Sequence, residues 1–445
     1  METLRIVMTL SLFVVIFILV QTDRVERGLA MIGGAILFLL LGWMFDFYIL
    51  EEAFEAIYFD SLALLFGMSL ISNVLYRSGL FHDLAFRAVR YSQGNRLLIL
   101  TILILATYAA SLCFNNLSVM VIVLPLTLVL CQSLAMPAAP LVAAELIASN
   151  LGGASTLVGD FPNMIIGSVA RLHFDDFIGG MMVPCLVLLA VLLVHFQKYA
   201  SGSASKGLDM DAIHQALAQL SPQHTSADKI VVDSYLFKVG GWGFILSLLG
   251  FFLAKPLGIL PAMISLLAGL AMLFWGRIPR EGFFSAMSGG DLLFFLGLFV
   301  MVGGLQAAGV LELFHAVIVT LGGNQTTTTL VVLMWLAGIV TPLFNAGPTT
   351  ALLIPVVKGM SGDFSGDAIW WALSLGVLAG SSATLSGATA GPVVASTMAR
   401  YAREMSRDRP MVGEVLDFHG YLQWGIPVSL LFLMLSTVYI TFIAM

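Results

Sequence analysis

The stretch SNLGGASTLVGDFPN (residues 149–163) interrupts an otherwise apolar segment that runs from about 140 to 170. Its glycines allow close backbone approach, its hydroxyls and amides offer neutral oxygens, and half-helix ends supply partial charges. In a membrane, an unwound backbone is tolerated only where protein or a hydrated cavity satisfies its N–H and C=O groups. Residues 149–163 therefore predict an unwound binding segment, with helix packing by small residues as the alternative.

The composition of the whole chain is that of a membrane protein. Hydrophobic residues make up 59% of the 445 residues and charged residues only 10%, against roughly 25% in soluble globular proteins. A net charge of −6 without a basic cluster excludes a nucleic-acid-binding protein. The apolar excess also excludes a disordered chain or a secreted disulfide scaffold. The three cysteines lie in apolar segments without metal-ligand spacing, so no thiol metal site is predicted.

Apolar segments long enough to span a bilayer occur along the whole chain, since a spanning helix needs about 20 mostly apolar residues. Uninterrupted spans are predicted at about 4–20, 28–46, 60–76, 177–197, 235–253, 258–275, 291–307 and 420–443. Two further crossings are predicted as broken helices at 140–170 and 368–399, where Gly, Ser, Thr and Pro interrupt the apolar run.

Two other stretches, 97–135 and 325–360, are too long for a single span and carry polar centres at 113–116 and 344–348. An Asn-containing tip between two apolar arms is typical of a re-entrant hairpin, and two ordinary spans with a tight turn are the alternative. The predicted fold class is therefore an all-α polytopic membrane protein. It has about ten crossings, two of them broken helices, plus two re-entrant hairpins.

The charges of the loops predict the orientation. In this topology sixteen of the twenty lysines and arginines fall on one side, and only Arg5, Arg171, Lys255 and Lys358 fall on the other. Because positively charged loops stay in the cytoplasm, we expect a multi-pass protein of the cytoplasmic (inner) membrane with both termini outside.

The second half of the chain repeats features of the first. An offset of 230 superimposes Phe114-Asn115 on Phe344-Asn345, and an offset of 228 superimposes Thr156 on Thr384. Hairpin tip thus falls on hairpin tip, and broken helix on broken helix. Since each half contributes an odd number of crossings, the second half is predicted to be an inverted repeat. That arrangement is typical of secondary transporters with a site near the midplane.

Asp160 is the acid placed within an unwound segment of the predicted membrane region. An ionisable group at that depth is costly and is a functional candidate by default, able to carry a proton or to help hold Na⁺. Capping of the half-helix that follows is the alternative. Ala388 stands at the equivalent place in the second repeat, so only one half carries the acid. Glu145, in the same segment, is a weaker candidate that is expected to face water.

Two amphipathic stretches, 77–96 and 308–324, each follow a span and precede a hairpin, and they are predicted to be arm helices in the membrane interface. Residues 198–234 read as a cytoplasmic linker between the repeats. No Ser-His-Asp or HExxH arrangement falls inside the spans, so an enzyme is not predicted. No cofactor is expected beyond a coupling ion, Na⁺ or H⁺.

Residues 149–163 resemble the SNxGGxxTxxGDPPN signature of the ion transporter superfamily. The closest branch is the citrate-transporter-like one, with arsenite permeases, D-type sodium/proton antiporters and the pigmentation P protein. The resemblance covers nearly the whole chain, both hairpins included. The chain departs from the pattern at Phe161, where the family usually has a first proline. It also departs in the second half, where the motif from Gly380 to Pro392 is degenerate.

The resemblance implies a homodimer whose scaffold (1–76 and 235–307) stays fixed while a transport body (97–197 and 325–443) moves, elevator fashion. It also implies a binding site for ion and substrate with one group of side chains from each half. These are Asn115, Asn116, Asn150, Thr156, Asp160 and Asn163, and Asn345, Thr349, Thr350, Ser381, Ser382 and Thr384. A Na⁺ would lie near Asn115, Asn150 and Asp160.

Three functions remain open from the sequence. The first is a Na⁺- or H⁺-coupled carrier of a small anion or oxyanion, carboxylate or arsenite-like, favoured by half-helix N-termini that face a cavity with no fixed positive charge. The second is a sodium/proton antiporter, favoured by Asp160 and the neutral oxygens around it. The third, a channel or an intramembrane enzyme, is disfavoured by the inverted repeat.

Overall fold

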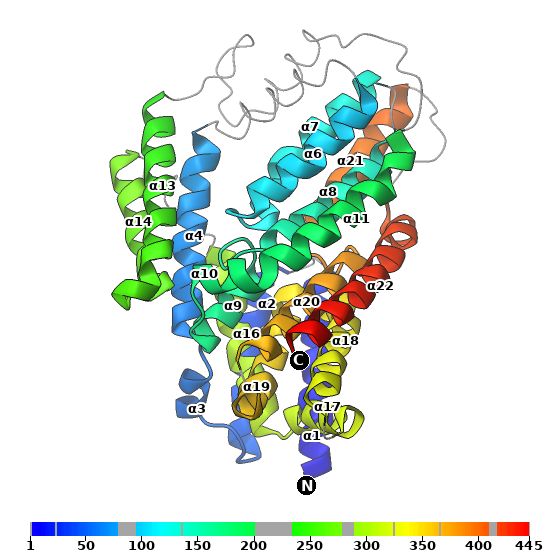
Figure 1. Cartoon of the computed structure of the whole chain (residues 1–445). Helices are drawn as coiled ribbons and strands as arrows, with labels where there is room; N and C mark the ends of the chain where they lie inside the picture. Colours follow the sequence, from blue (N-terminus) through cyan, green and yellow to red (C-terminus); the bar gives the residue numbers. More distant parts are fainter. Residues whose placement is uncertain are drawn as a thin grey trace.

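The computed structural model describes residues 2–22, 25–78, 95–134, 137–200, 234–277, 289–323, 325–364, 366–408 and 416–444. Within these ranges every regular element is a helix (Figure 1). Most of the predicted arm at 77–96 and of the predicted linker at 198–234 lies outside them.

The first half of the chain contains α1 (Glu2–Gln21), α2 (Arg27–Met44), α3 (Leu50–Glu55), α4 (Phe59–Arg77), α6 (Arg96–Ser111), α7 (Asn116–Leu134), α8 (Ala138–Ala154), α9 (Phe161–Ala170), α10 (Phe174–Phe177), the π-helical turn η1 (Ile178–Met182) and α11 (Val183–Ala200). The second half contains α13 (Ser234–Leu257), α14 (Pro261–Trp275), α16 (Gly289–Ala307), α17 (Leu311–Gly322), α18 (Thr326–Phe344), α19 (Ala346–Met360), the 3₁₀ turn η2 (Ser361–Asp363), α20 (Ala368–Ala383), α21 (Gly391–Asp408) and α22 (Phe418–Ile443).

Eight helices of the described residues are long and apolar enough to cross a membrane. The prediction of an all-helical, multi-pass membrane protein is thereby confirmed. The predicted span at 258–275 differs, because Gly258 has φ +65° and Pro261 opens the next helix. α14 is therefore only 15 residues long. Conversely, α18, predicted as one arm of a hairpin, is by itself long enough to cross.

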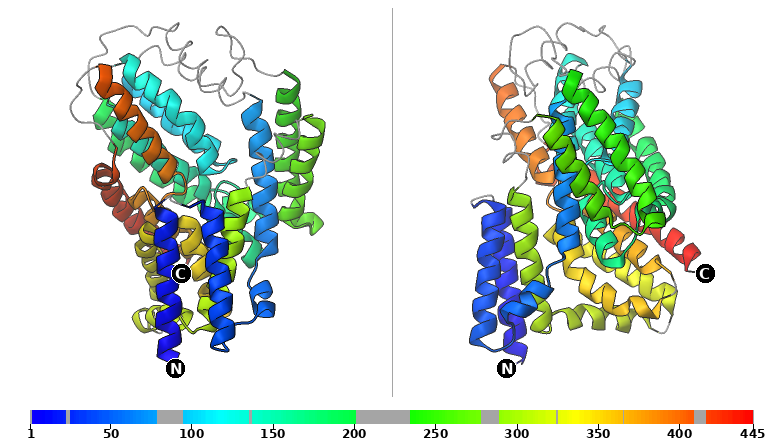
Figure 2. Two further views of the ribbon diagram at one scale, coloured as in Figure 1. Left: turned by 180° about the vertical axis from the view of Figure 1, so that it is seen from behind. Right: turned by 90° about the vertical axis from the view of Figure 1, so that its left-hand side faces the viewer.

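Two groups of three helices pack by close backbone contact. The group α4, α13 and α14 lies at one edge of the molecule (Figure 1), and the group α1, α2 and α16 lies lower in the right-hand view of Figure 2. A Cβ atom added at Gly67 of α4 would lie 2.5 Å from Leu266 N of α14. One added at Gly297 of α16 would lie 2.6 Å from Met31 O of α2. Gly67 and Gly297 are related by the offset of 230, so equivalent glycines build equivalent crossings.

The remaining helices form the two hairpins, the two interrupted segments and the helices that close them. α6 and α7 join at residues 112–115, and α18 and α19 join at Asn345, which has φ +75°. The chain is not helical at 155–160 and at 384–390. Both breaks are shorter than the predicted 149–163 and 380–391. Where a longer unwound segment was predicted, Gly153 stays helical, and a Cβ there would lie 2.7 Å from Asn116 Oδ1. Gly152 and Gly153, at the end of α8, therefore allow close helix packing.

Aromatic rings join the hairpin tips to the two three-helix groups. Phe114 stacks on Phe244 of α13 with ring centroids 5.0 Å apart, and Phe344 packs edge-on against Phe17 of α1 at 5.3 Å. Each tip thus contacts the first helix of the opposite half of the chain through an apolar surface.

α17 occupies most of the amphipathic stretch at 308–324. It is 12 residues long and lies across the end of the molecule near the start of α1 (Figure 2). Several of its large apolar side chains are exposed, namely Leu313, Val317, Val319 and Leu321.

Candidate ion- and substrate-binding site

Asp160 ends the first break and caps α9, so the capping alternative holds for this residue. Its side chain is 6% exposed. Oδ1 accepts hydrogen bonds from Phe161 N at 2.9 Å and from Thr389 Oγ1 at 3.3 Å, and Oδ2 accepts one from Asn116 Nδ2 at 2.9 Å. All three donors are neutral, and no cationic side chain of the described residues pairs with Asp160. Burial without a cationic partner favours the neutralisation of a carboxylate by a proton or by a bound cation.

A chain of amides connects Asp160 to the second half of the protein. Asn116 Nδ2 also lies 3.3 Å from Asn150 Oδ1, and Asn150 Nδ2 donates to Ser381 O at 3.2 Å. Asn116 Oδ1 is buried and has no partner among the described residues. α7, α8, α9 and α20 thus converge on one buried polar cluster, which we call the Asp160 cluster: Asn116, Asn150, Asp160, Ser381 and Thr389.

Asn163, in the first turn of α9, holds the first break in shape. Its Nδ2 donates to Ala154 O and Thr156 O, both at 2.9 Å, and more weakly to Gly153 O at 3.4 Å. Its Oδ1 accepts from Ser374 Oγ of α20 at 2.7 Å. The amide is therefore fully used inside the protein, and it satisfies carbonyl groups that the break leaves without helical partners.

The second break is held in a related way. Asn345 Nδ2 donates to Ser386 O and Ala388 O, both at 3.0 Å. Thr384 Oγ1 donates to Pro342 O at 3.2 Å. In the first half, Thr156 donates to Leu112 O at 2.5 Å, so threonines at matching positions bind matching carbonyls. These bonds tie each break to the hairpin tip of its own half.

The other side chains named from the sequence lie around these bonds, and Ser381 joins the Asp160 cluster only through its backbone carbonyl. Asn115 Oδ1 caps α7 by accepting from Ser118 N at 2.8 Å. The hydroxyls of Thr350, Ser381 and Ser382 donate to carbonyls of their own helices. Thr349 Oγ1 is buried without a partner in the described part of the chain.

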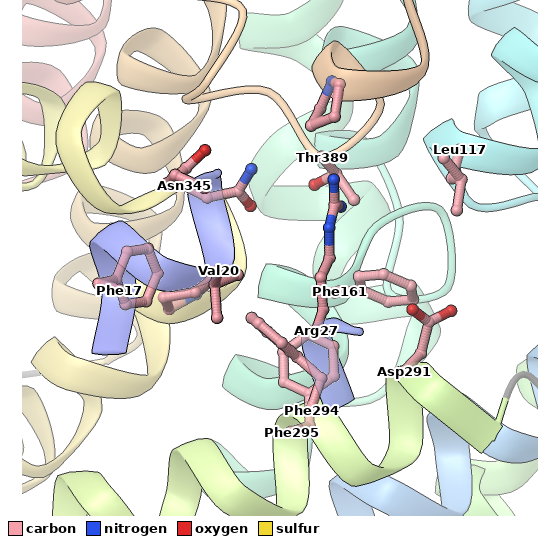
Figure 3. A pocket seen from close by; sticks show the side chains of 13 residues that line it. Phe17, Val20, Arg27, Leu117, Phe161, Asp291, Phe294, Phe295, Asn345 and Thr389 are labelled. Atoms are coloured by element: carbon pink, nitrogen blue, oxygen red, sulfur yellow. The ribbon is translucent and has the colours of Figure 1, made fainter. Parts of the chain in front are cut away.

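A pocket of about 80 Å³ lies beside the cluster (Figure 3). It is large enough for a small ion with a few water molecules. Phe161, Pro348 and Pro392, at the starts of α9, α19 and α21, line it together with Asn345, Thr389, Arg27 and Asp291. The expectation of a cavity with no fixed positive charge is wrong for this pocket. Arg27 extends into it from the start of α2, and its side chain points towards Thr389 (Figure 3).

Besides Arg27, sequence reasoning missed or misplaced three residues. Thr389 follows Ala388, the position already paired with Asp160, so the repeat offset pointed to it. Ser374 gave no signal beyond being a hydroxyl in an apolar helix. Glu145 was expected to face water, whereas its side chain is completely buried on α8, where α7 covers it. No group of three or more His, Cys, Asp or Glu side chains that could hold a metal ion occurs in the described ranges.

Multiple membrane-crossing helices, two interrupted helices and a buried carboxylate beside a small pocket together define a secondary transporter, and not an enzyme. Residues 15–376 match the family model described as citrate transporter. The chain belongs to this family.

Named relatives are similar over almost their full length. The magnetosome protein MamN of Magnetospirillum gryphiswaldense is 39% identical, covering 98% of this chain and 99% of its own. An uncharacterized transporter of Mycobacterium tuberculosis is 30% identical, with 98% and 97% covered. The crystal structure of the Alcanivorax borkumensis YdaH transporter aligns with a TM-score of 0.58 at 16% identity, over 94% of this chain and 98% of that one. This last likeness concerns the fold alone.

Proposed function

We propose that the protein is a Na⁺- or H⁺-coupled carrier that moves a small anion or oxyanion, carboxylate or arsenite-like, across the cytoplasmic membrane. The observation that carries the proposal is the Asp160 cluster. A buried carboxylate there meets side chains from both halves of the chain at the edge of a pocket. Loading of Asp160 with a proton or Na⁺ neutralises the cluster and couples the ion to the substrate in the pocket.

The anion is proposed to sit in the pocket, where the starts of three half-helices and the guanidinium of Arg27 favour negative charge. Asp291 lines the same pocket and limits its positive potential. The volume of about 80 Å³ favours a compact anion, and a larger carboxylate requires the pocket to widen.

The movement is proposed to be that of an elevator. α1–α4 and α13–α16 form the scaffold, and α6–α11 and α18–α22 form the transport body. The matched glycine crossings and the matched threonine bonds support two inverted repeats. α17 is then an arm between scaffold and body. Homodimer formation and external termini belong to the same proposal, the latter supported by the loop charges.

A sodium/proton antiporter is the second candidate. The absence of a cationic partner at Asp160 among the described residues favours it, because one carboxylate can then exchange H⁺ for Na⁺. Under this alternative Arg27 and Asp291 line the pocket without binding an anion, and no anion is transported with the exchanged ions.

Flux into proteoliposomes separates the two, with Na⁺ and pH gradients imposed one at a time against a panel of arsenite, dicarboxylates and ²²Na⁺. We expect anion uptake driven by one of the two gradients. Gradient-driven ²²Na⁺ exchange for H⁺ without any anion would establish the antiporter instead. Flux that does not saturate and needs no gradient would contradict both carriers.

A further inference from the structure

Glu145 is a second buried carboxylate of the proposed transport body, and the function proposed above makes no use of it. Its side chain is 0% exposed. Oε1 accepts a hydrogen bond of 2.6 Å from Thr127 Oγ1 of α7, and Oε2 has no partner in the described structure. The hydroxyl of Ser149, one turn further along α8, is also buried without a partner. Residues i and i+4 of a helix lie on one face.

No charged side chain that the structure describes neutralises Glu145. The titratable side chains described on helices packed against α8 are Arg96 and Tyr108 of α6, Cys131 of α7, Cys185, His195 and Lys198 of α11, Arg400 and Tyr401 of α21, and His419, Tyr421 and Tyr439 of α22. None of them forms an ion pair or a hydrogen bond with Glu145, whose bonded partner is Thr127.

The threonine partner is the informative feature. A hydroxyl can donate to a carboxylate and can accept from a carboxylic acid, whereas a backbone N–H can only donate. Asp160 has the same kind of partner in Thr389. Each of the two acids therefore lies beside a group that suits both of its protonation states.

The surroundings select a proton over a metal cation. Leu141, Val142 and Leu146, close to Glu145 on α8, are buried and apolar, and Thr127 is the residue of the described structure that is hydrogen-bonded to the carboxylate. A metal cation needs several oxygen ligands, whereas a proton neutralises a carboxylate by one covalent bond.

We propose that Glu145 is a second proton-binding site of the transport body, loaded from the end at which α7 finishes and α8 begins. It lies about 10 Å along α8 from Ala138, and about 7 Å before Asn150 of the Asp160 cluster, at 1.5 Å per residue. The proton enters at Oε1 or Oε2, with the Thr127 hydroxyl turning to accept or donate, and leaves by the same end or towards Asp160. The link to transport rests on the proposed function, but the binding of the proton does not.

Infrared difference spectra of the purified protein between acidic and alkaline buffer test the binding directly, since a protonated carboxyl group has a carbonyl band that a carboxylate lacks. We expect Glu145→Gln to remove one such band, Asp160→Asn to remove another, and the double variant to remove both. An unchanged difference spectrum in Glu145→Gln means that Glu145 keeps one protonation state, which overturns the proposal.

Thr127→Val guards against a Gln variant that fails to fold, because valine has the shape of threonine but no hydroxyl. It keeps the acid, so the band should persist with a shifted pH midpoint. An unshifted midpoint contradicts the role of the hydroxyl.

The proton-to-substrate ratio, taken from the reversal potential in proteoliposomes, should fall in Glu145→Gln. An unchanged ratio overturns the link to transport. Coupled flux that survives Asp160→Asn, with the Glu145 band still titrating, refutes only the coupling role proposed for Asp160 and leaves the proton site at Glu145 standing.

Discussion

Asn163→Ala should destabilise the protein strongly while leaving Asp160 itself in place. The substitution removes two hydrogen bonds of 2.9 Å to backbone carbonyls and leaves the hydroxyl of Ser374 without its 2.7 Å acceptor. A buried group left unsatisfied costs about 1–3 kcal/mol. The three groups together predict a loss of about 3–9 kcal/mol, a large part of the roughly 5–15 kcal/mol that stabilises a folded domain.

Ser374→Ala is the matched control, because it removes one of these bonds and should cost about 1 kcal/mol. Both variants and their double mutant are unfolded by denaturant in mixed micelles, and the double-mutant cycle gives the coupling between the two side chains. Asn163→Asp should be worse than Asn163→Ala, since an acceptor would then face the carbonyls of Ala154 and Thr156. An Asn163→Asp variant as stable as the wild type would refute the view that this amide holds the break.

Three other substitutions test the site and the packing. Asp160→Asn should nearly abolish coupled flux, because the titratable group is gone, while membrane insertion persists. The new amide N–H faces a hydrogen-bond donor, which costs about 1–3 kcal/mol. Unchanged flux with unchanged pH dependence would contradict a role of Asp160 in transport. Gly67→Ala should cost about 1–3 kcal/mol by overpacking, measured as unfolding of the purified protein. Gly33→Ala, whose Cβ would meet nothing within 4 Å, should be neutral, and equal stability of the two refutes the close crossing. Lys255→Met removes an ion pair of 2.5 Å to Asp176 between α13 and α10, a half-exposed contact worth about 0–1 kcal/mol. Because α13 belongs to the proposed scaffold and α10 to the proposed transport body, this pair resists movement of the body. Lys255→Met should therefore raise the initial transport rate in low salt only, where the charges are not screened. The same increase in high salt would contradict an electrostatic origin.

Much of the site is visible in the local sequence. Asp160 stands out because an acid in an apolar segment is costly, and its role as a helix cap follows from the proline that comes two residues later. The offset of 228 pairs Thr156 with Thr384, and the offset of 230 pairs the two hairpin tips. Each of these threonines donates a hydrogen bond to a carbonyl at the hairpin tip of its own half. Such features are short-range or periodic, so they leave a trace in the order of residues.

The extent of the breaks could not be read in the same way. Glycine permits both an unwound backbone and a close helix crossing, and Gly153 adopts the second role because Asn116 of another helix packs against it.

The sequence by itself determined that this chain crosses a membrane many times, that its halves correspond, and that a carboxylate lies where the second of two half-helices begins. Hydrophobic length, repeat spacing and the cost of a buried charge are properties of the chain that no partner segment can change. Only the tertiary structure decided which polar groups meet. Thr389 reaches Asp160 and Arg27 enters the pocket because segments far apart in the sequence pack together, and Glu145 is covered because α7 folds back against α8. Burial and hydrogen-bond partners depend on those contacts, and nothing in the local sequence fixes them.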